Sequence, residues 1–468
     1  MKKSLLAVAA IGAFASAAQA QSSVTVYGIL DVGYTGSNSS ITNGRSAAGS
    51  AATVNYPATT VTNGVAGTGA GGYPSNTLKQ TQSLFGQSAE QTSRLGFKGT
   101  EDLGGGTSAF FTVEFGLRPE EQLVSGNTVG GLNNRQTFVG LKKTGLGDAA
   151  IGTQYQPVHI AVSKTDPGQQ NNMTGSVLYT GQADSGVVGA VGGNQNAYQS
   201  RFSNSITLNS EVMAGFQAHA MAVLNNANAT QVNNQFGQTA AGGNTNTNGW
   251  ALGLDYTWNK LFATANYTSM KQLTSLCNLT NTALSTTTTC AAGTPASSVF
   301  AAAQGGAPAA TWATTATSTN ANGQGVNILD NTTYVGATYD FGILKAYAGW
   351  ISRKAQDTAN SGFYQKRQAE QIGVRSYITP KIESWASAGV GTFTPMGFNQ
   401  NSAHFNAWQL GSNYWLSKRT NLYAIYGQYA QANSTYVTGA NAATGSGGTT
   451  AQTSVNANSY AVGVRHTF

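Results

Sequence analysis

The feature that most constrains this chain is a series of paired segments in which apolar and polar residues alternate across a very short turn. The last such segment ends the chain and places Tyr460, Val462, Val464, His466 and Phe468 on one face. Alternation with a period of two predicts β-strands with one apolar face. A soluble protein must bury that face in a core, whereas a membrane barrel turns it toward lipid. The choice between these two decides the fold class.

The connections between the expected strands alternate between short and long. Short connections are expected near residues 101–107, 143–148, 209–214, 259–260, 342–343, 379–383 and 417–419. Long ones are expected near residues 36–92, 116–134, 156–197, 225–249, 271–330, 355–367, 394–406 and 430–458. This asymmetry is typical of outer-membrane barrels, which have tight periplasmic turns and long external loops. We therefore predict an all-β chain forming a transmembrane antiparallel barrel of about sixteen strands, with both termini at the periplasmic end and the first strand paired with the last.

The N-terminus has the pattern of an export signal. Met1-Lys2-Lys3 is followed by an apolar run from Leu5 to Ala18 and by the small-x-small site Ala18-Gln19-Ala20. The run is too short to span a hydrocarbon core of ~30 Å as a helix, which argues against a membrane anchor. We expect a signal peptide over residues 1–20 and a barrel domain over residues 21–468.

The composition supports β structure and excludes several kinds of partner. Charged residues make up only 9% of the chain, 58 residues are glycine, and the mean hydropathy of −0.20 suits strands that carry only alternate apolar residues. The net charge is +7, without a dense Lys/Arg run, so we expect no nucleic-acid partner. No clustered ligands or catalytic motifs point to a metal, a cofactor or an enzyme.

Two cysteines, Cys277 and Cys290, lie in one low-complexity segment. An exported protein meets an oxidising compartment, which favours a disulfide that staples this loop. A reactive thiol is the alternative, but no histidine lies near either cysteine in the sequence.

Five sequence blocks together resemble general porins of β-proteobacteria. They are Ser22–Asp31, Ser93–Gly104, Asn134–Leu141, Leu416–Tyr423 and Val464–Phe468. The resemblance implies a sixteen-stranded trimeric barrel in the outer membrane that passes ions and small hydrophilic solutes by diffusion. It also implies a third long loop, here 156–197, that folds into the lumen. We further expect contact with outer-membrane lipid and lipopolysaccharide, and recognition of Phe468 by the barrel-assembly machinery.

The resemblance also implies arginines on the barrel wall facing the third loop, and these match Arg94, Arg135 and Arg201. For Arg94 the alternation gives independent support, because Arg94 and Lys98 share a face opposite Leu95 and Phe97. At Arg135 and Arg201 the alternation is too weak to decide which way the side chain faces. In the third loop, Lys164, Asp166 and Asp184 are candidates for an opposing wall, with solvated loop residues as the equal alternative.

Fixed guanidinium groups in a narrow aqueous passage enrich anions and deplete cations, so we predict an anion-preferring diffusion channel. Three alternatives stay open. The first is a barrel specific for one organic acid or sugar. The second is an adhesin or phage receptor that acts through loop 271–330. An outer-membrane barrel enzyme would need a rim nucleophile near His159 or His404, and we expect none.

Overall fold

The computed structural model describes residues 23–43, 76–121, 131–179, 197–225, 247–275, 325–357, 364–394, 402–438 and 449–468. Residues 1–20, Asp184, Cys277, Cys290 and most of the long loop 271–330 therefore lie outside the described residues. The signal peptide and the disulfide stay predictions.

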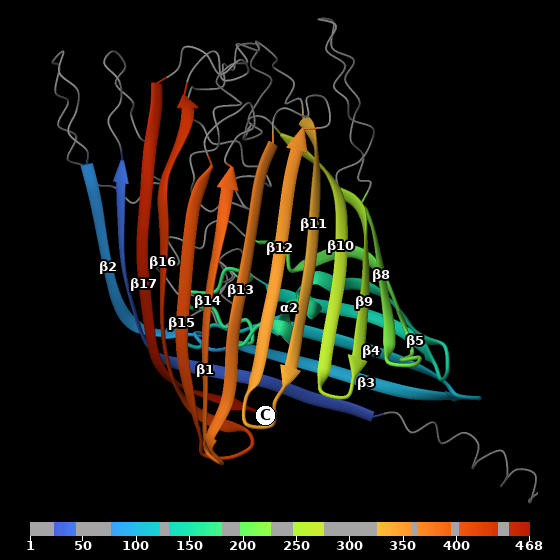
Figure 1. Ribbon diagram of the computed structural model, residues 1–468. Coiled ribbons are helices and arrows are strands. Elements are labelled where there is room, and N and C mark those ends of the chain that lie inside the picture. The colour runs from blue at the N-terminus through green and yellow to red at the C-terminus, as the bar shows by residue number, and fades with distance from the viewer. Residues whose placement is uncertain are drawn as a thin grey trace, which may run out of the picture.

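Nearly all of the described chain is β-strand, arranged around a single helix (Figure 1). The strands in the first half are β1 (Ser23–Asn43), β2 (Asn76–Gln87), β3 (Arg94–Gly104), β4 (Thr107–Gly116), β5 (Asn133–Lys143), β6 (Gly147–Tyr155), β7 (Arg201–Ser210) and β8 (Phe216–Asn225). Those in the second half are β9 (Thr247–Trp258), β10 (Leu261–Ser275), β11 (Gly325–Asp340), β12 (Lys345–Asp357), β13 (Tyr364–Thr379), β14 (Ile382–Thr394), β15 (Ala403–Trp415), β16 (Thr420–Thr438) and β17 (Thr449–Thr467). The helix α2 (Pro157–Thr165) lies within the ring of strands.

These 17 strand segments form one closed antiparallel barrel with 16 wall positions, as the alternation predicts. β1 pairs with β17 along one edge, which closes the ring. Along its other edge β1 pairs first with β3 and then with β2. β2 and β3 therefore share one wall position, interrupted by residues 88–93. Closure leaves the barrel without an open edge where the first and last strands meet.

The faces of the strands follow the predicted alternation. On β9, Leu252 is 53% exposed on the outer face, whereas Asp255 is 5% exposed on the inner face. On β1, Val24 and Val32 face outward while Asp31 is fully buried inside. Since apolar side chains cover the outside and charged side chains such as Asp31 and Asp255 face inward, the outer surface suits hydrocarbon and the lumen admits water.

The short connections lie at one end of the barrel, where the C-terminus also lies (Figure 1). The β9–β10 hairpin turns over only Asn259 and Lys260, and Asn259 adopts a positive φ of 51°, which asparagine tolerates better than most residues. The long connections are shorter than expected, because β1 continues to Asn43 and β2 begins at Asn76 within the expected loop 36–92. These extensions are rich in Ser, Asn and Gln, so they lack the apolar alternation, and backbone pairing alone defines them.

Within the described ranges, no helix combines the length and the apolarity needed to cross a membrane.

Candidate constriction site

The third long connection runs from Tyr155 to Arg201 and enters the lumen, as expected for an inward-folded loop. Its helix α2 begins at Pro157, where a missing N–H costs no hydrogen bond. Apolar residues of the loop are buried against inward-facing side chains of β11 to β16; the cluster includes Val158, Val162, Val177, Leu178, Tyr334, Ile351, Phe393 and Phe405. The loop is thus held to one wall of the barrel by an apolar core inside the lumen.

Charged residues of the loop fix it in place. Asp166 is 1% exposed, and its carboxylate accepts hydrogen bonds from the backbone N–H of Gln170 at 2.7 Å and from Nε2 of Gln371 on β13 at 2.9 Å. Burial raises the pKa of the Asp166 carboxyl, and these hydrogen bonds oppose that rise. Lys164 forms an ion pair of 2.6 Å with Asp255 on β9. Asp166 and Lys164 therefore anchor the loop and do not line the pocket described next.

Two arginines of β13 also hold the loop, through its backbone. Nη2 of Arg367 donates to the carbonyl oxygen of Val177, and Nη1 of Arg375 donates to that of Pro167, both at 2.7 Å. Both contacts tie the loop to β13, so the loop cannot leave this wall without breaking buried hydrogen bonds.

On its other side the loop faces a polar pocket of about 350 Å³. The three arginines matched by the sequence, Arg94, Arg135 and Arg201, all line this pocket, although they come from β3, β5 and β7. His159 of α2 and Tyr179 of the loop line it from the opposite side. The geometry thus brings three guanidinium groups to one narrow place between the wall and the loop.

Irregular pairing explains why the alternation is uninformative at two of these arginines. The β4–β5 register shifts so that Glu114 pairs with Gln136 and Phe115 with Asn134, which leaves Arg135 as an extra residue. The β6–β7 register also shifts two residues beyond Arg201, near Asn204, which has a φ of 53°. β-Bulges of this kind turn a side chain away from the face that its sequence position implies.

One carboxylate accompanies the three guanidinium groups. Nε of Arg135 donates to Oε1 of Glu114 at 2.8 Å, and Nη2 donates to the hydroxyl of Tyr155 at 2.7 Å. Glu114 also accepts a hydrogen bond from Tyr27 at 3.1 Å. Among the described residues, one buried carboxylate stands beside three guanidinium groups, so this part of the site carries more positive than negative charge.

Aromatic rings form the rest of the pocket wall. His159 stacks on Tyr155 with ring centroids 4.2 Å apart, and the guanidinium of Arg201 lies 5.6 Å from the centre of the Tyr155 ring. Burial, together with the nearby arginines, lowers the pKa of His159 well below its ordinary value, so its imidazole is neutral at neutral pH. The positive charge of the pocket therefore comes from its arginines alone.

Lys98 lies outside this pocket. It is exposed, and its Nζ lies 5.4 Å from the centre of the Tyr27 ring. It stands on the same strand as Arg94, four positions closer to the short-turn end. Lys98 therefore adds charge to the approach to the pocket rather than to the pocket itself.

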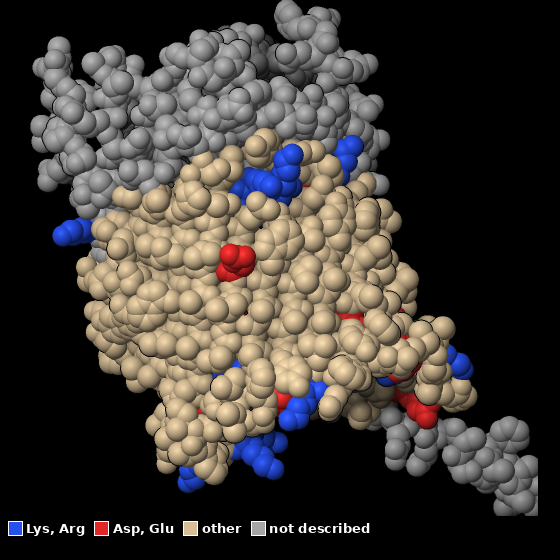
Figure 2. Space-filling model, viewed as in Figure 1, with Lys and Arg blue, Asp and Glu red and all other residues tan. Residues whose placement is uncertain are grey.

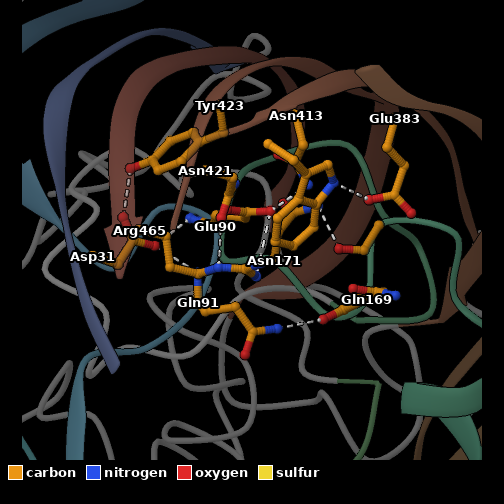
Figure 3. Close-up of polar contacts among 12 residues, drawn as sticks. Asp31, Glu90, Gln91, Gln169, Asn171, Glu383, Asn413, Asn421, Tyr423 and Arg465 are labelled. Atoms are coloured by element: carbon orange, nitrogen blue, oxygen red, sulfur yellow. Dashed lines mark hydrogen bonds and ion pairs between the residues drawn. The ribbon is translucent and has the colours of Figure 1, made fainter. Parts of the chain in front are cut away.

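The sequence gives no signal for a second polar cluster that supports the site. Residues 88–93 bend inward between β2 and β3, and Glu90 is buried there (Figure 3). Its carboxylate accepts hydrogen bonds of 2.8 Å from Asn413 and Asn421 and forms an ion pair of 3.4 Å with Arg465. Next to it, Nε of Arg94 donates to the carbonyl oxygen of Thr92 at 2.9 Å. The inward segment thus connects the Arg94 side chain to the strands that close the barrel.

In the part of the chain that the structure describes, no group of three or more His, Cys, Asp or Glu residues is arranged to hold a metal ion.

A family profile described as Gram-negative porin matches residues 7–434. An outer membrane porin protein of Bordetella pertussis is 34% identical over 171 residues, and outer membrane porin protein 32 of Delftia acidovorans is 32% identical over 166 residues. Each alignment covers 36% of this chain, and only 37% and 35% of the two relatives. The chain thus spans little more than a third of the length of the curated relatives it matches.

Solved structures are similar over a longer stretch. An anion-selective porin from Comamonas acidovorans superposes with a TM-score of 0.56 at 17% identity, covering 96% of this chain and all of that one. The trimer form of OmpT from Vibrio cholerae gives a TM-score of 0.53 at 12% identity, covering 96% of this chain and 99% of that one. At these identities the likeness concerns the fold.

Proposed function

Because this chain belongs to the Gram-negative porin family, which is located in the outer membrane, we propose that it forms a water-filled channel for passive diffusion of ions and small hydrophilic solutes and prefers anions. The observation that carries the proposal is the convergence of Arg94, Arg135 and Arg201 on one pocket beside the inward loop. Low-dielectric walls focus the field of such charges, which raises the local concentration of anions and lowers that of cations.

The test is the reversal potential of single channels in a KCl gradient across a planar bilayer. The wild type is expected to give the sign of an anion-preferring pore, and raised ionic strength should weaken the preference. The double variant Arg94→Gln/Arg201→Gln should move the potential toward that of a non-selective pore. A control, Lys418→Gln/Arg419→Gln, removes two charges from the exposed β15–β16 turn and should leave the potential unchanged. Cation preference in the wild type would refute the role of the arginines and leave the fold intact.

We further propose a homotrimer, which the trimer form of the similar OmpT structure supports. Conductance that appears in steps of three in the same bilayer record would agree with this assembly. Steps of one unit only, together with a monomeric mass in detergent, would contradict it.

A substrate-specific channel is the second candidate, and the aromatic side of the pocket favours it. Tyr155, His159 and Tyr179 place aromatic rings next to the guanidinium groups, an arrangement that suits a planar aromatic carboxylate. Concentration-dependent block of the chloride current by benzoate, but not by acetate at the same concentration, would support this function.

Three expectations remain predictions. An adhesin or phage-receptor role rests on loop 271–330, most of which lies outside the described residues. The absence of enzymatic activity rests on the family, whose members are channels. Recognition by the assembly machinery rests on Phe468, whose backbone pairs with Gly28 of β1 in two hydrogen bonds of 3.0 and 3.1 Å, so that the last residue completes the closing seam.

A further inference from the structure

Two lysines face each other on the outside of the barrel. Lys354 of β12 and Lys366 of β13 are directly paired in the strand register. Their side chains point outward, because along each strand they alternate in step with Trp350 and Ile372, which are exposed on the outer face. Ile351 and Ala369, on the opposite alternation, are buried on the inner face. Both lysines are half-buried. They lie on the part of these strands that is distant from the short turns.

The pair stands at the boundary between two kinds of outer surface. Toward the short turns, the same face of β11 to β14 exposes Val335, Trp350, Ile372 and Val390. Around the lysines the outward residues are polar and include Asn331, Gln368 and Thr394. Figure 2 shows basic side chains gathered over the upper part of β12 and β13, above a broad belt that is almost free of Lys and Arg. This boundary is where the headgroups of the outer leaflet meet the protein.

Among the residues that the structure describes, no carboxylate neutralises the two lysines. Like charges directly opposite each other on neighbouring strands destabilise a sheet. Among the described residues, neither lysine has an ion-pair partner, and the acidic side chain on the same face, Glu370, stands four residues from Lys366, roughly 13 Å along the strand. The Lys354 ammonium is instead positioned by the ring of Tyr364, with Nζ 4.6 Å from its centre. Oδ1 of Asn331, opposite Lys354 in the register, also lacks a hydrogen-bond partner within the described part of the chain.

We propose that Lys354 and Lys366 together bind a phosphate group of a phosphorylated lipid headgroup in the outer leaflet. An anion between the two ammonium groups relieves their repulsion and supplies the negative charge that the described residues around the pair lack. The apolar belt directly beneath receives the acyl chains of the same molecule, so one lipid satisfies both surfaces. The inference rests on the outer-membrane location of the chain and does not depend on the ion preference of the channel.

The test measures binding of the folded, purified protein in a neutral detergent to bisphosphorylated lipid A, and to the same lipid A after removal of its phosphates. The variant Lys354→Gln/Lys366→Gln is expected to bind bisphosphorylated lipid A about 30-fold more weakly, given ~1 kcal/mol for each lysine near an anionic lipid surface and tenfold for each 1.4 kcal/mol. Lys354→Arg/Lys366→Arg keeps the charges and should keep the binding. The matched control Lys381→Gln/Lys418→Gln removes two lysines from the short turns at the other end and should bind like the wild type. A change of gel mobility on heating verifies that every variant is folded.

Three results would overturn the proposal. One is equal affinity of the wild type for lipid A with and without phosphates, and another is an unchanged affinity of the Gln double variant. The third is displacement of lipid A by inorganic phosphate at an equal concentration, which would mean that the pair binds the free anion and not a lipid. Because lipid binding is measured without any current, failure here leaves the channel proposal untouched.

Discussion

The hydroxyl of Tyr423 donates a hydrogen bond of 2.6 Å to Oδ1 of Asp31, and this contact crosses the strand that lies between them. Asp31 belongs to β1 and Tyr423 to β16, whereas β17 pairs with both strands. The second oxygen of Asp31 accepts the backbone N–H groups of Glu90 and Gln91 at 2.8 and 2.6 Å. One buried carboxylate therefore joins the closing seam to the inward segment 88–93 (Figure 3).

Removing this hydroxyl should destabilise the barrel. The variant Tyr423→Phe leaves Oδ1 of Asp31 buried without its partner, which costs about 1–3 kcal/mol in the free energy of unfolding. Urea unfolding of the protein in detergent micelles, followed by tryptophan fluorescence, measures the change. Tyr426→Phe on the outward face of the same strand is the matched control and should change stability by less than about 0.5 kcal/mol. Equal changes in the free energy of unfolding for the two variants would show that the hydrogen bond to Asp31 does not stabilise the barrel.

The ion preference should respond in opposite directions to changes of opposite charge in the pocket. Glu114→Gln removes the carboxylate that pairs with Arg135 and is expected to strengthen the anion preference, because the change makes the pocket one charge more positive. The reversal potential in a KCl gradient is the measurement. Glu101→Gln, an exposed position on β3, is the control and should have little effect. A shift toward cations in Glu114→Gln would contradict the arginine filter.

The sequence predicts the barrel well because the lipid-facing and water-facing sides repeat a local pattern. The alternation around Leu252 and Asp255 is enough to orient a whole strand. The candidate site is harder to predict, because its geometry depends on distant contacts. Arg135 faces the pocket through a bulge, and Glu90 is held by Asn413, which lies 323 positions further along the chain. No local sequence pattern predicts the bulge at Arg135 or the contact between Glu90 and Asn413.

Asp166 illustrates the same limit for charge. From the sequence, an acidic residue in the third loop is an equal candidate for an acidic pore wall or a solvated position. The structure buries it against Gln371 of β13, where it holds the loop. Which of two chemically similar acids faces water depends on how the loop packs, and that packing involves β11 to β16.

The width of the pocket should depend on how closely the loop approaches β16. A Cβ atom added at Gly427 would meet the backbone carbonyl oxygen of Thr174, a contact that real Cβ atoms do not make. Gly427→Ala should therefore push the loop away from this wall and toward the arginines, and lower the single-channel conductance. In the control Gly116→Ala, the new methyl would meet only the side-chain end of Asn133 at 3.3 Å, which can adjust. A conductance in Gly427→Ala equal to that of the wild type would contradict the predicted displacement of the loop.

The buried imidazole of His159 should give the barrel a characteristic pH dependence of stability. Burial lowers its pKa in the folded state, so below the ordinary value of about 6.5 the unfolded chain binds the proton more readily than the folded one. The free energy of unfolding should therefore fall as the pH drops from 8 to 5, and His159→Gln should lose that part of the dependence. Asp166 changes the free energy of unfolding in the opposite direction, because burial raises the pKa of its carboxyl and stability is lost as the pH rises above about 3.9. Both the wild type and His159→Gln contain Asp166, so the difference between them cancels this contribution. His404→Gln, an exposed position on β15, is the control and should retain the wild-type slope.

Because His159 stays neutral, the reversal potential should be the same at pH 8 and pH 6. A stronger anion preference at pH 6 that disappears in His159→Gln would show that the imidazole is protonated in the folded channel.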